Sequence, residues 1–297
     1  MMRDQPDSPR PGRQEQGFTL VELIMVMVLL GILSASFLVF FRPMLDAYVD
    51  AQRRADLSDL ADTALRRMMQ ELRTAVPNSV NLVNQNCFQF VPSIGGGRYR
   101  LDLDATNDVA PPCVPSATCS AFPNPAGAAG VATPVDILVR DSGAAIAAGD
   151  FLAINSQSQG AFYGAAGGAV GGARYTVNAV AAAPRASDGV QRVTLSRNPA
   201  AGGYAGGRFQ MVSAAQPSVM YSCSGGRLLR SVQGTAALAA CAAAGEVVAT
   251  DVAACDFSYA ANPSATQANG FVSLFLQLAR DGERVSLSYG VHVDNLP

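Results

Sequence analysis

From Phe18 onward, hydrophobic and polar positions divide the chain into three parts, of which the first is almost entirely apolar. From Phe18 to Phe41 there are 24 residues, and Glu22 is the only ionisable one. As a helix this run would be roughly 36 Å long at about 1.5 Å per residue, enough to cross a hydrocarbon core of about 30 Å. The pattern predicts a transmembrane helix over 18–42. A charge inside such a segment is costly unless it finds a partner, so Glu22 is a candidate functional residue.

The second part, residues 43–76, is amphipathic. Between Leu57 and Leu72 apolar residues recur at spacings of three and four, while arginines and aspartates fill the other positions. This pattern is typical of a helix with one side buried against a globular domain. We expect it to continue the first helix, with a kink or break at Pro43 and an end at Pro77-Asn78-Ser79.

The third part, residues 77–297, alternates short apolar segments with turn-rich loops and predicts a β-rich globular domain. Two tight hairpins are expected at Gly225-Gly226 and Asp281-Gly282. The glycine-rich segment 160–173 is expected to be a mobile loop. We consider either one domain or two β lobes, about 77–215 and 216–297. The predicted strands are 88–91, 135–139, 151–154, 175–180, 192–195, 218–223, 227–232, 256–259, 272–278 and 284–293.

A short motif stands at the start of the apolar run. Residues Gly17 to Glu22 read Gly-Phe-Thr-Leu-Val-Glu, which resembles the processing signature of type IV pilins and pseudopilins. The resemblance implies that a prepilin peptidase cuts between Gly17 and Phe18 and methylates the new amino group of Phe18. It also implies that Glu22 pairs with the terminal amine of a neighbouring subunit. Elementary electrostatics favours such a pair, because two opposite charges are far less costly to bury together than apart.

Two plainer interpretations of the same segment compete with this one. A secretory signal could be cut after Ser34-Ala35-Ser36, or the helix could be a simple anchor. The apolar run continues through residues 37–41, where a signal-peptide cleavage region should turn polar. The pilin-type signal is therefore the preferred interpretation.

The resemblance extends to one branch of minor pilins, those of the mannose-sensitive haemagglutinin (MSHA) pilus biogenesis set, and more distantly to the J-type minor pseudopilin of type II secretion. The resemblance covers residues 17–100 and 218–297, and it is weak over residues 101–217. It implies an α+β, type IV pilin-like fold in which a long N-terminal helix packs on an antiparallel β-sheet domain with loop insertions. Its later matches are Ala47–Val80, Gly97–Arg100, Met220–Cys223, Leu228–Arg230, Ala254–Tyr259 and Val291–Pro297.

The implied function is that of a structural subunit, not an enzyme, which primes, caps or joins a pilus. The alternatives are a pseudopilin of a type II secretion system and a pilus-tip adhesin. The implied partners are prepilin peptidase, other major and minor pilins, and an inner-membrane assembly platform. No cofactor is expected.

Charge sets the expected topology. Residues 1–17 form a leader containing Arg3, Arg10 and Arg13, which favour a cytoplasmic N-terminus and hence a periplasmic domain over 77–297. We expect a single pass through a bacterial inner membrane before assembly. The formal net charge is −2, and no basic face is apparent, so nucleic acid is not an expected partner.

Six cysteines in an exported chain favour disulfides. A disulfide between Cys113 and Cys119 would close the shortest loop. Cys223 could pair with Cys255 or Cys241, and Cys255 is slightly preferred. Cys87 is the sixth cysteine.

Other candidate chemistry is sparse. No metal site is expected, although Asp102, Asp104 and Asp108 weakly resemble a calcium loop that lacks the distal Glu. His292 is the only histidine, and its alternating context indicates a sheet residue rather than a catalytic one.

Overall fold

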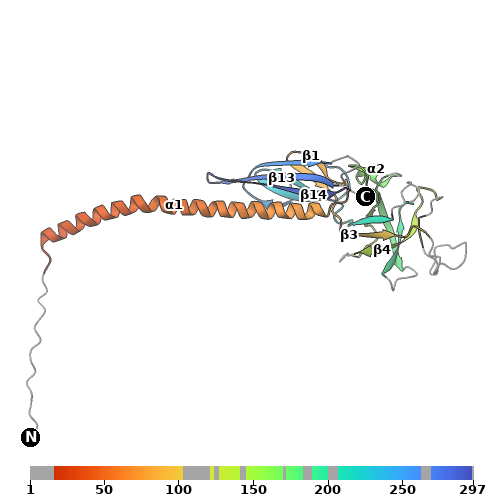
Figure 1. The fold of residues 1–297 in the computed structure, drawn as a ribbon, viewed down its shortest axis with the longest axis horizontal. Helices are drawn as coiled ribbons and strands as arrows, with labels where there is room; N and C mark the ends of the chain where they lie inside the picture. The colour runs from red at the N-terminus through yellow and green to blue at the C-terminus, as the bar shows by residue number, and fades with distance from the viewer. Residues whose placement is uncertain are drawn as a thin grey trace, which may run out of the picture. The chain divides into compact units, whose positions relative to one another are not determined.

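The computed structural model describes residues 17–102, 121–123, 127–140, 145–169, 172–182, 189–199, 207–261 and 269–295. It contains two compact units, Met1–Arg53 and Arg54–Pro297, and the backbone of the second is mainly antiparallel β-structure (Figure 1). A long helix followed by antiparallel sheets confirms the expected α+β, pilin-like class.

The long helix α1 runs from Leu20 to Arg73 and includes Pro43. The break considered at Pro43 is therefore wrong. Proline removes one helical hydrogen bond, the one its missing N–H would donate to the carbonyl of Val39, but the bonds on either side keep the helix continuous. The end at Arg73 agrees with the expectation that Pro77-Asn78-Ser79 follows the helix.

In the second unit, the last five turns of α1 bury one side. The buried side chains there are Leu57, Ala61, Ala64, Leu65, Met68 and Leu72. They join a core that also contains Phe88, Tyr221 and Phe257. Phe88 meets Phe257 edge-on with ring centroids 5.1 Å apart, one of the favourable aromatic geometries.

Charged side chains on the flanks of the same helix segment reach the strands beside it. Arg67 donates to Glu246 at 2.7 and 2.9 Å, and Arg230 donates to Glu71 at 2.9 and 3.0 Å. Arg54 donates to Glu283, with a second bond of 3.1 Å. These pairs fix the helix over both sheets of the core.

The first sheet has five strands in the order β1-β2-β9-β10-β11. Their bounds are Asn81–Asn84, Cys87–Phe90, Ser218–Ser224, Arg227–Gln233 and Glu246–Ala249. The second sheet is a meander of β12 (Val252–Ala260), β13 (Asn269–Arg280) and β14 (Glu283–Asp294). Both predicted hairpin turns are confirmed, with positive φ at Gly225, Gly226, Asp281 and Gly282.

Between β2 and β9 the chain forms a closed barrel in the order β3-β4-β7-β6-β5-β8. The strands are β3 (Gly95–Tyr99), β4 (Thr133–Arg140), β5 (Phe151–Ala153), β6 (Arg174–Ala182), β7 (Val190–Leu195) and β8 (Arg208–Val212). Their inward residues form a core of their own. The lobe boundary considered near 215 follows the barrel closely, but β1 and β2 pair with the later sheet and not with the barrel.

The described part of the glycine-rich segment 160–173 is packed rather than loose, which corrects the expectation of a mobile loop. It contains a helical turn, α2 (Gly164–Gly168), and Phe162 and Tyr163 are buried. Arg174 donates to the carbonyl groups of Phe162 at 3.2 Å and Gly164 at 2.7 Å. One arginine side chain thus provides hydrogen-bond donors for two backbone carbonyl groups of this segment.

Candidate functional site

The first turn of α1 is built by Thr19. Its Oγ1 accepts a hydrogen bond from the backbone N–H of Glu22 at 3.3 Å, and its carbonyl accepts from Leu23 N–H at 3.2 Å. These are the contacts of an N-cap residue, and Thr19-Leu20-Val21-Glu22 has capping-box spacing. Glu22 is therefore fixed in the first helical turn, where the helix dipole favours a negative charge.

Gly17 and Phe18, between which cleavage is expected, lie just before the helix. Neither is helical, and Phe18 is 81% exposed. Thr19 separates them from the first helical residue, so the bond between them can enter a peptidase without unwinding α1.

The carboxylate of Glu22 has no compensating charge nearby in its own helix. Across the described ranges it forms no hydrogen bond or ion pair through its side chain. The next ionisable residue, Arg42, lies twenty positions later, roughly 30 Å along a helix. A cation that neutralises Glu22 in an apolar environment must therefore come from the chain's own N-terminus or from another molecule.

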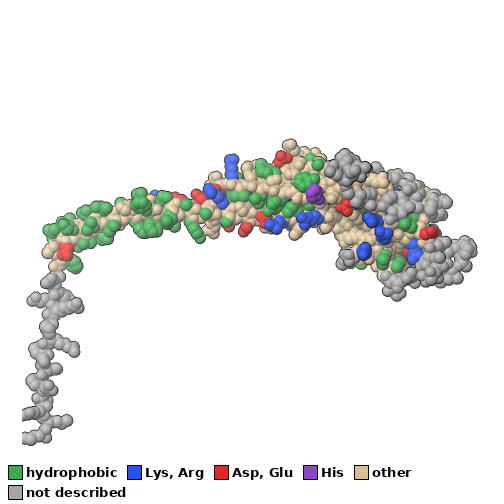
Figure 2. Space-filling view, viewed as in Figure 1, with side chains coloured by type: hydrophobic (Ala, Val, Ile, Leu, Met, Phe, Trp, Pro, Cys, Tyr) green, Lys and Arg blue, Asp and Glu red, His purple; other side chains and the backbone are tan. Residues whose placement is uncertain are grey.

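An exposed apolar surface surrounds this carboxylate. Figure 2 shows hydrophobic side chains along the first part of α1. Every Val, Leu, Ile, Met and Phe from Phe18 to Leu45 is exposed, including Leu30 at 56% and Phe40 at 78%. Such a surface is far larger than the few hundred Å² that soluble monomers leave open. It is long and apolar enough to cross a membrane, and its N-terminal position fits a membrane anchor.

Two disulfides hold the second unit together. Cys223 of β9 is bonded to Cys255 of β12, which joins the two core sheets. Cys87 of β2 is bonded to Cys241 in the segment between β10 and β11. The pairing considered between Cys113 and Cys119 lies outside the described residues.

The structure does not bring the calcium candidate residues or His292 together with other groups in a site, among the described residues. Asp104 and Asp108 of the weak calcium candidate lie outside the described residues, while Asp102 is exposed at the edge of them. No group of three possible metal ligands occurs in the described part of the chain. His292 is exposed on β14, with its ring 5.1 Å from that of Phe271.

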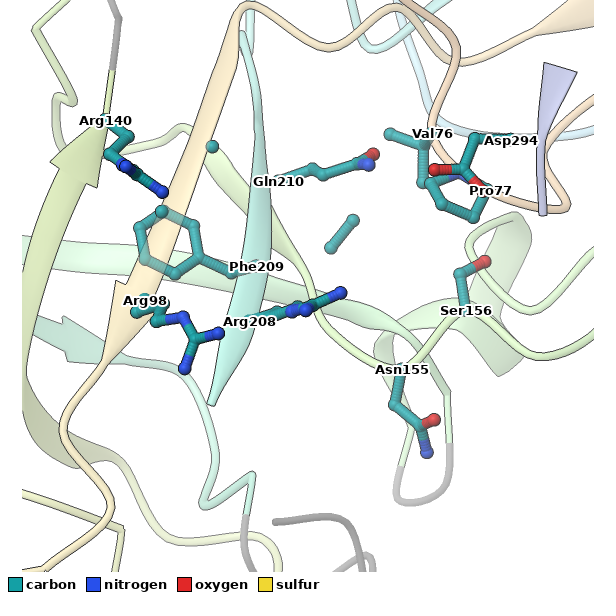
Figure 3. Close-up of a pocket in the computed structure, with 13 residues that line it drawn as sticks. Val76, Pro77, Arg98, Arg140, Asn155, Ser156, Arg208, Phe209, Gln210 and Asp294 are labelled. Atoms are coloured by element: carbon teal, nitrogen blue, oxygen red, sulfur yellow. The ribbon is translucent and has the colours of Figure 1, made fainter. Parts of the chain in front are cut away.

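Two features escaped the sequence interpretation. The capping role of Thr19 could have been recognised from the Thr-x-x-Glu spacing ahead of an apolar run. A cationic pocket beside the barrel, with Arg98 and Arg208 in its lining (Figure 3), could not. Its residues come from strands far apart in the sequence, and only the barrel closure brings them together.

Comparison with known proteins identifies one matching family. Residues 12–38 match the family described as the prokaryotic N-terminal methylation motif. No curated protein and no solved structure matches the chain. The matched segment contains Gly17, Phe18 and Glu22 together with most of the exposed apolar surface, so the chain carries a pilin-type methylation motif on a long apolar helix.

Proposed function

We propose that this chain is a minor pilin-like structural subunit of a type IV pilus of the MSHA type, close to the O component of that biogenesis set. It works by assembly: the N-terminal helix enters the filament, and the globular domain primes, caps or joins it. The single observation that supports this most strongly is the methylation motif at residues 12–38, placed at the start of an exposed apolar helix.

Assembly follows from the electrostatics of the first turn. Cleavage between Gly17 and Phe18 creates an α-ammonium group, and methylation of Phe18 leaves it charged. In our proposal this cation meets Glu22 of an adjacent subunit, because both charges lie in apolar surroundings where separate burial is expensive. The pairing sets the stagger between neighbouring helices, while the apolar surface of α1 supplies most of the contact area.

The proposed location follows from the same segment. Before assembly the helix spans the bacterial inner membrane once, with the leader in the cytoplasm and residues 77–297 in the periplasm. Two disulfides in the second unit suit an oxidising compartment. The partners in this proposal are a prepilin peptidase, other pilins and an inner-membrane assembly platform, and the chain acts as a structural component rather than an enzyme.

The main alternative is a minor pseudopilin of a type II secretion system, since the methylation motif is common to both kinds of subunit. Deleting the gene distinguishes them. We expect loss of surface pili with normal exoprotein secretion. Loss of secretion with intact pili would assign the chain to the secretion machine instead.

Processing itself is tested by intact mass and N-terminal fragmentation of the protein purified from native membranes. We expect a chain that begins at Phe18 with one added methyl group, and an unprocessed chain in a strain without the peptidase. A chain beginning at Phe37 would indicate an ordinary secretory signal. A chain that retains residues 1–17 in the wild-type strain would leave a simple membrane anchor, and the assembly proposal would be abandoned.

A further inference from the structure

Two arginines face each other on the outside of the barrel. β3 and β8 pair antiparallel with Arg98 directly opposite Arg208, and Arg140 of β4 lies opposite Gly96. Like charges in directly opposed positions of a sheet are destabilising. In the described ranges none of these three exposed guanidinium groups makes a hydrogen bond or an ion pair. The barrel therefore retains a cationic cluster that its own fold does not neutralise.

Gly96 leaves a gap in the middle of this cluster. It stands between Arg140 on one neighbouring strand and Gln210 on the other. A Cβ at Gly96 would lie 2.9 Å from the carbonyl oxygen of Phe209, so a larger residue does not fit without backbone movement. The gap contributes to a pocket of about 410 Å³ beside the arginines (Figure 3). That volume is in the usual range for small-molecule sites.

Neutral polar groups in the same pocket also lack partners. Ser156 is 3% exposed, and its Oγ has no hydrogen-bond partner among the described residues. The same holds for Asn155 Oδ1 and Gln210 Oε1. Leaving such buried groups unsatisfied costs free energy. The wall is nevertheless fixed, because the backbone carbonyl of Ser156 accepts from Asn78 Nδ2 at 2.6 Å.

One carboxylate, that of Asp294, lies on the far side of the pocket from β8, whereas Arg208 and Gln210 extend from β8 toward Val76 and Pro77 (Figure 3). The three arginines favour an anionic group. Asp294 instead favours donors such as hydroxyl groups, and the amides and the serine hydroxyl can both donate and accept. A bare inorganic anion would satisfy the arginines but be repelled by Asp294. A ligand that combines one acidic group with several hydroxyl groups matches both sides.

We propose that this pocket binds an acidic sugar residue, such as a uronic acid within a polysaccharide. The sugar carboxylate pairs with Arg98 and Arg208, and Arg140 adds to the positive potential. The ring hydroxyl groups meet Gln210 beside the arginines and Ser156 and Asp294 on the opposite wall. This site lies in the second unit and does not depend on the pilin-type processing of the N-terminus. The binding proposal is therefore tested independently of the proposed function.

The test is a calorimetric titration, in which short oligomers of galacturonate are added to the full-length processed protein in detergent. We expect saturable binding that weakens as salt is raised. Neutral galactose oligomers, sulfate and an acidic Asp-Glu peptide should each bind at least tenfold more weakly. Equal binding of the neutral sugars, equal binding of sulfate or of the peptide, or no galacturonate binding would each overturn the proposal.

Variants locate the site and separate binding from folding. Arg98→Glu should reduce galacturonate affinity at least tenfold, while the thermal midpoint is unchanged or higher because the repulsion with Arg208 is removed. Ser156→Ala should weaken binding several-fold with no loss of stability. Arg284→Ala, at an exposed position on β14 away from the pocket, is the matched control and should bind normally. Normal binding by both Arg98→Glu and Ser156→Ala would place the sugar elsewhere and refute the assignment of this pocket.

Discussion

Asn78 and Asn295 are hydrogen-bonded to each other through both backbone and side-chain atoms. Asn78 Nδ2 donates to the carbonyl of Asn295 at 3.0 Å, and Asn78 N–H donates to Asn295 Oδ1 at 3.2 Å. The same Nδ2 also donates to the carbonyl of Ser156. One side chain just after α1 thus ties together the end of β14 and the loop after β5. Asn78 has φ 58°, a left-handed conformation that asparagine tolerates better than most residues.

Replacing Asn78 should weaken the whole second unit. Asn78→Ala removes the side-chain bonds and places alanine in the left-handed region, so we expect a loss of about 2–4 kcal/mol in the free energy of unfolding. Asn78→Gly removes the same side-chain bonds without steric strain and should lose about 1 kcal/mol less. Denaturant unfolding of the detergent-solubilised chain measures both. Equal effects of the two substitutions would show that the left-handed backbone contributes nothing to the loss.

The disulfides should make large and unequal contributions. Cys223–Cys255 spans 32 positions and Cys87–Cys241 spans 154. In the chain-entropy account, a cross-link over the longer loop restricts the unfolded chain more, which corresponds to about 4 and about 5 kcal/mol respectively. Double Cys→Ser variants of each pair, compared by denaturant unfolding, should therefore both be strongly destabilised, the second more than the first. The reverse order would mean that the bond between the two core sheets acts mainly through the folded state.

Stability should fall on acidification through carboxylates around the second part of α1. The two hydrogen bonds from Arg67 lower the pKa of Glu246 below its usual 4.5. The hydroxyl of Tyr289 and then Arg66 lower the pKa of Asp62 below its usual 3.8. Because these pKa values are lower in the folded protein than in the unfolded chain, the stabilisation is complete above about pH 4.5. It is lost as the pH falls through the folded-state values.

A single variant tests this pH dependence. Glu246→Gln keeps the shape of the side chain but not its charge, so it should lose about 0.2–1 kcal/mol at neutral pH and show a shallower decline below pH 4.5. The measurement is the unfolding free energy from pH 7 to pH 3 at low salt. An acid decline identical to that of the wild type would exclude Glu246 as a contributor.

The sequence predicted the elements whose pattern is local. All ten expected strands are present among the described residues, because each is a short apolar segment between turn-rich loops; the signal is clearest where apolar and polar residues alternate, as in β13 and β14. Four strands were missed. β3 begins with Gly95-Gly96-Gly97, which has no side chains to alternate, and β1, β8 and β11 are only four or five residues long. The strand geometry of β3 and β8 is imposed by their pairing with each other across the chain.

The candidate sites also differ in whether their residues are close together in the sequence. Gly17, Phe18 and Glu22 stand within six positions, so one stretch of sequence was enough to define the motif. Arg98 and Arg208 are 110 positions apart and become neighbours only through the β3–β8 register. The packing of the described part of segment 160–173 involves Arg174, whose role as a donor to backbone carbonyls has no sequence signature.

Glu22 provides the sharpest test of assembly, because its expected role requires a negative charge and not merely a polar group. Glu22→Ala and Glu22→Gln should both be cleaved before Phe18 and methylated, since the residues at the cut are unchanged. Both should fail to enter filaments, because the α-ammonium of a neighbouring subunit would then be buried without a counter-charge. Immunodetection in sheared pilus fractions and in membranes measures this partition.

Thr19→Ala is the matched control for Glu22, since it removes the hydrogen bond that caps the first turn but leaves the carboxylate in place. It should weaken the helix terminus by about 1 kcal/mol and still permit incorporation. If Thr19→Ala were excluded from filaments as completely as Glu22→Ala, helix capping rather than charge pairing would be the requirement. If Glu22→Ala entered filaments normally, the lone carboxylate would have no part in assembly, and the chain would be better described as a static membrane anchor.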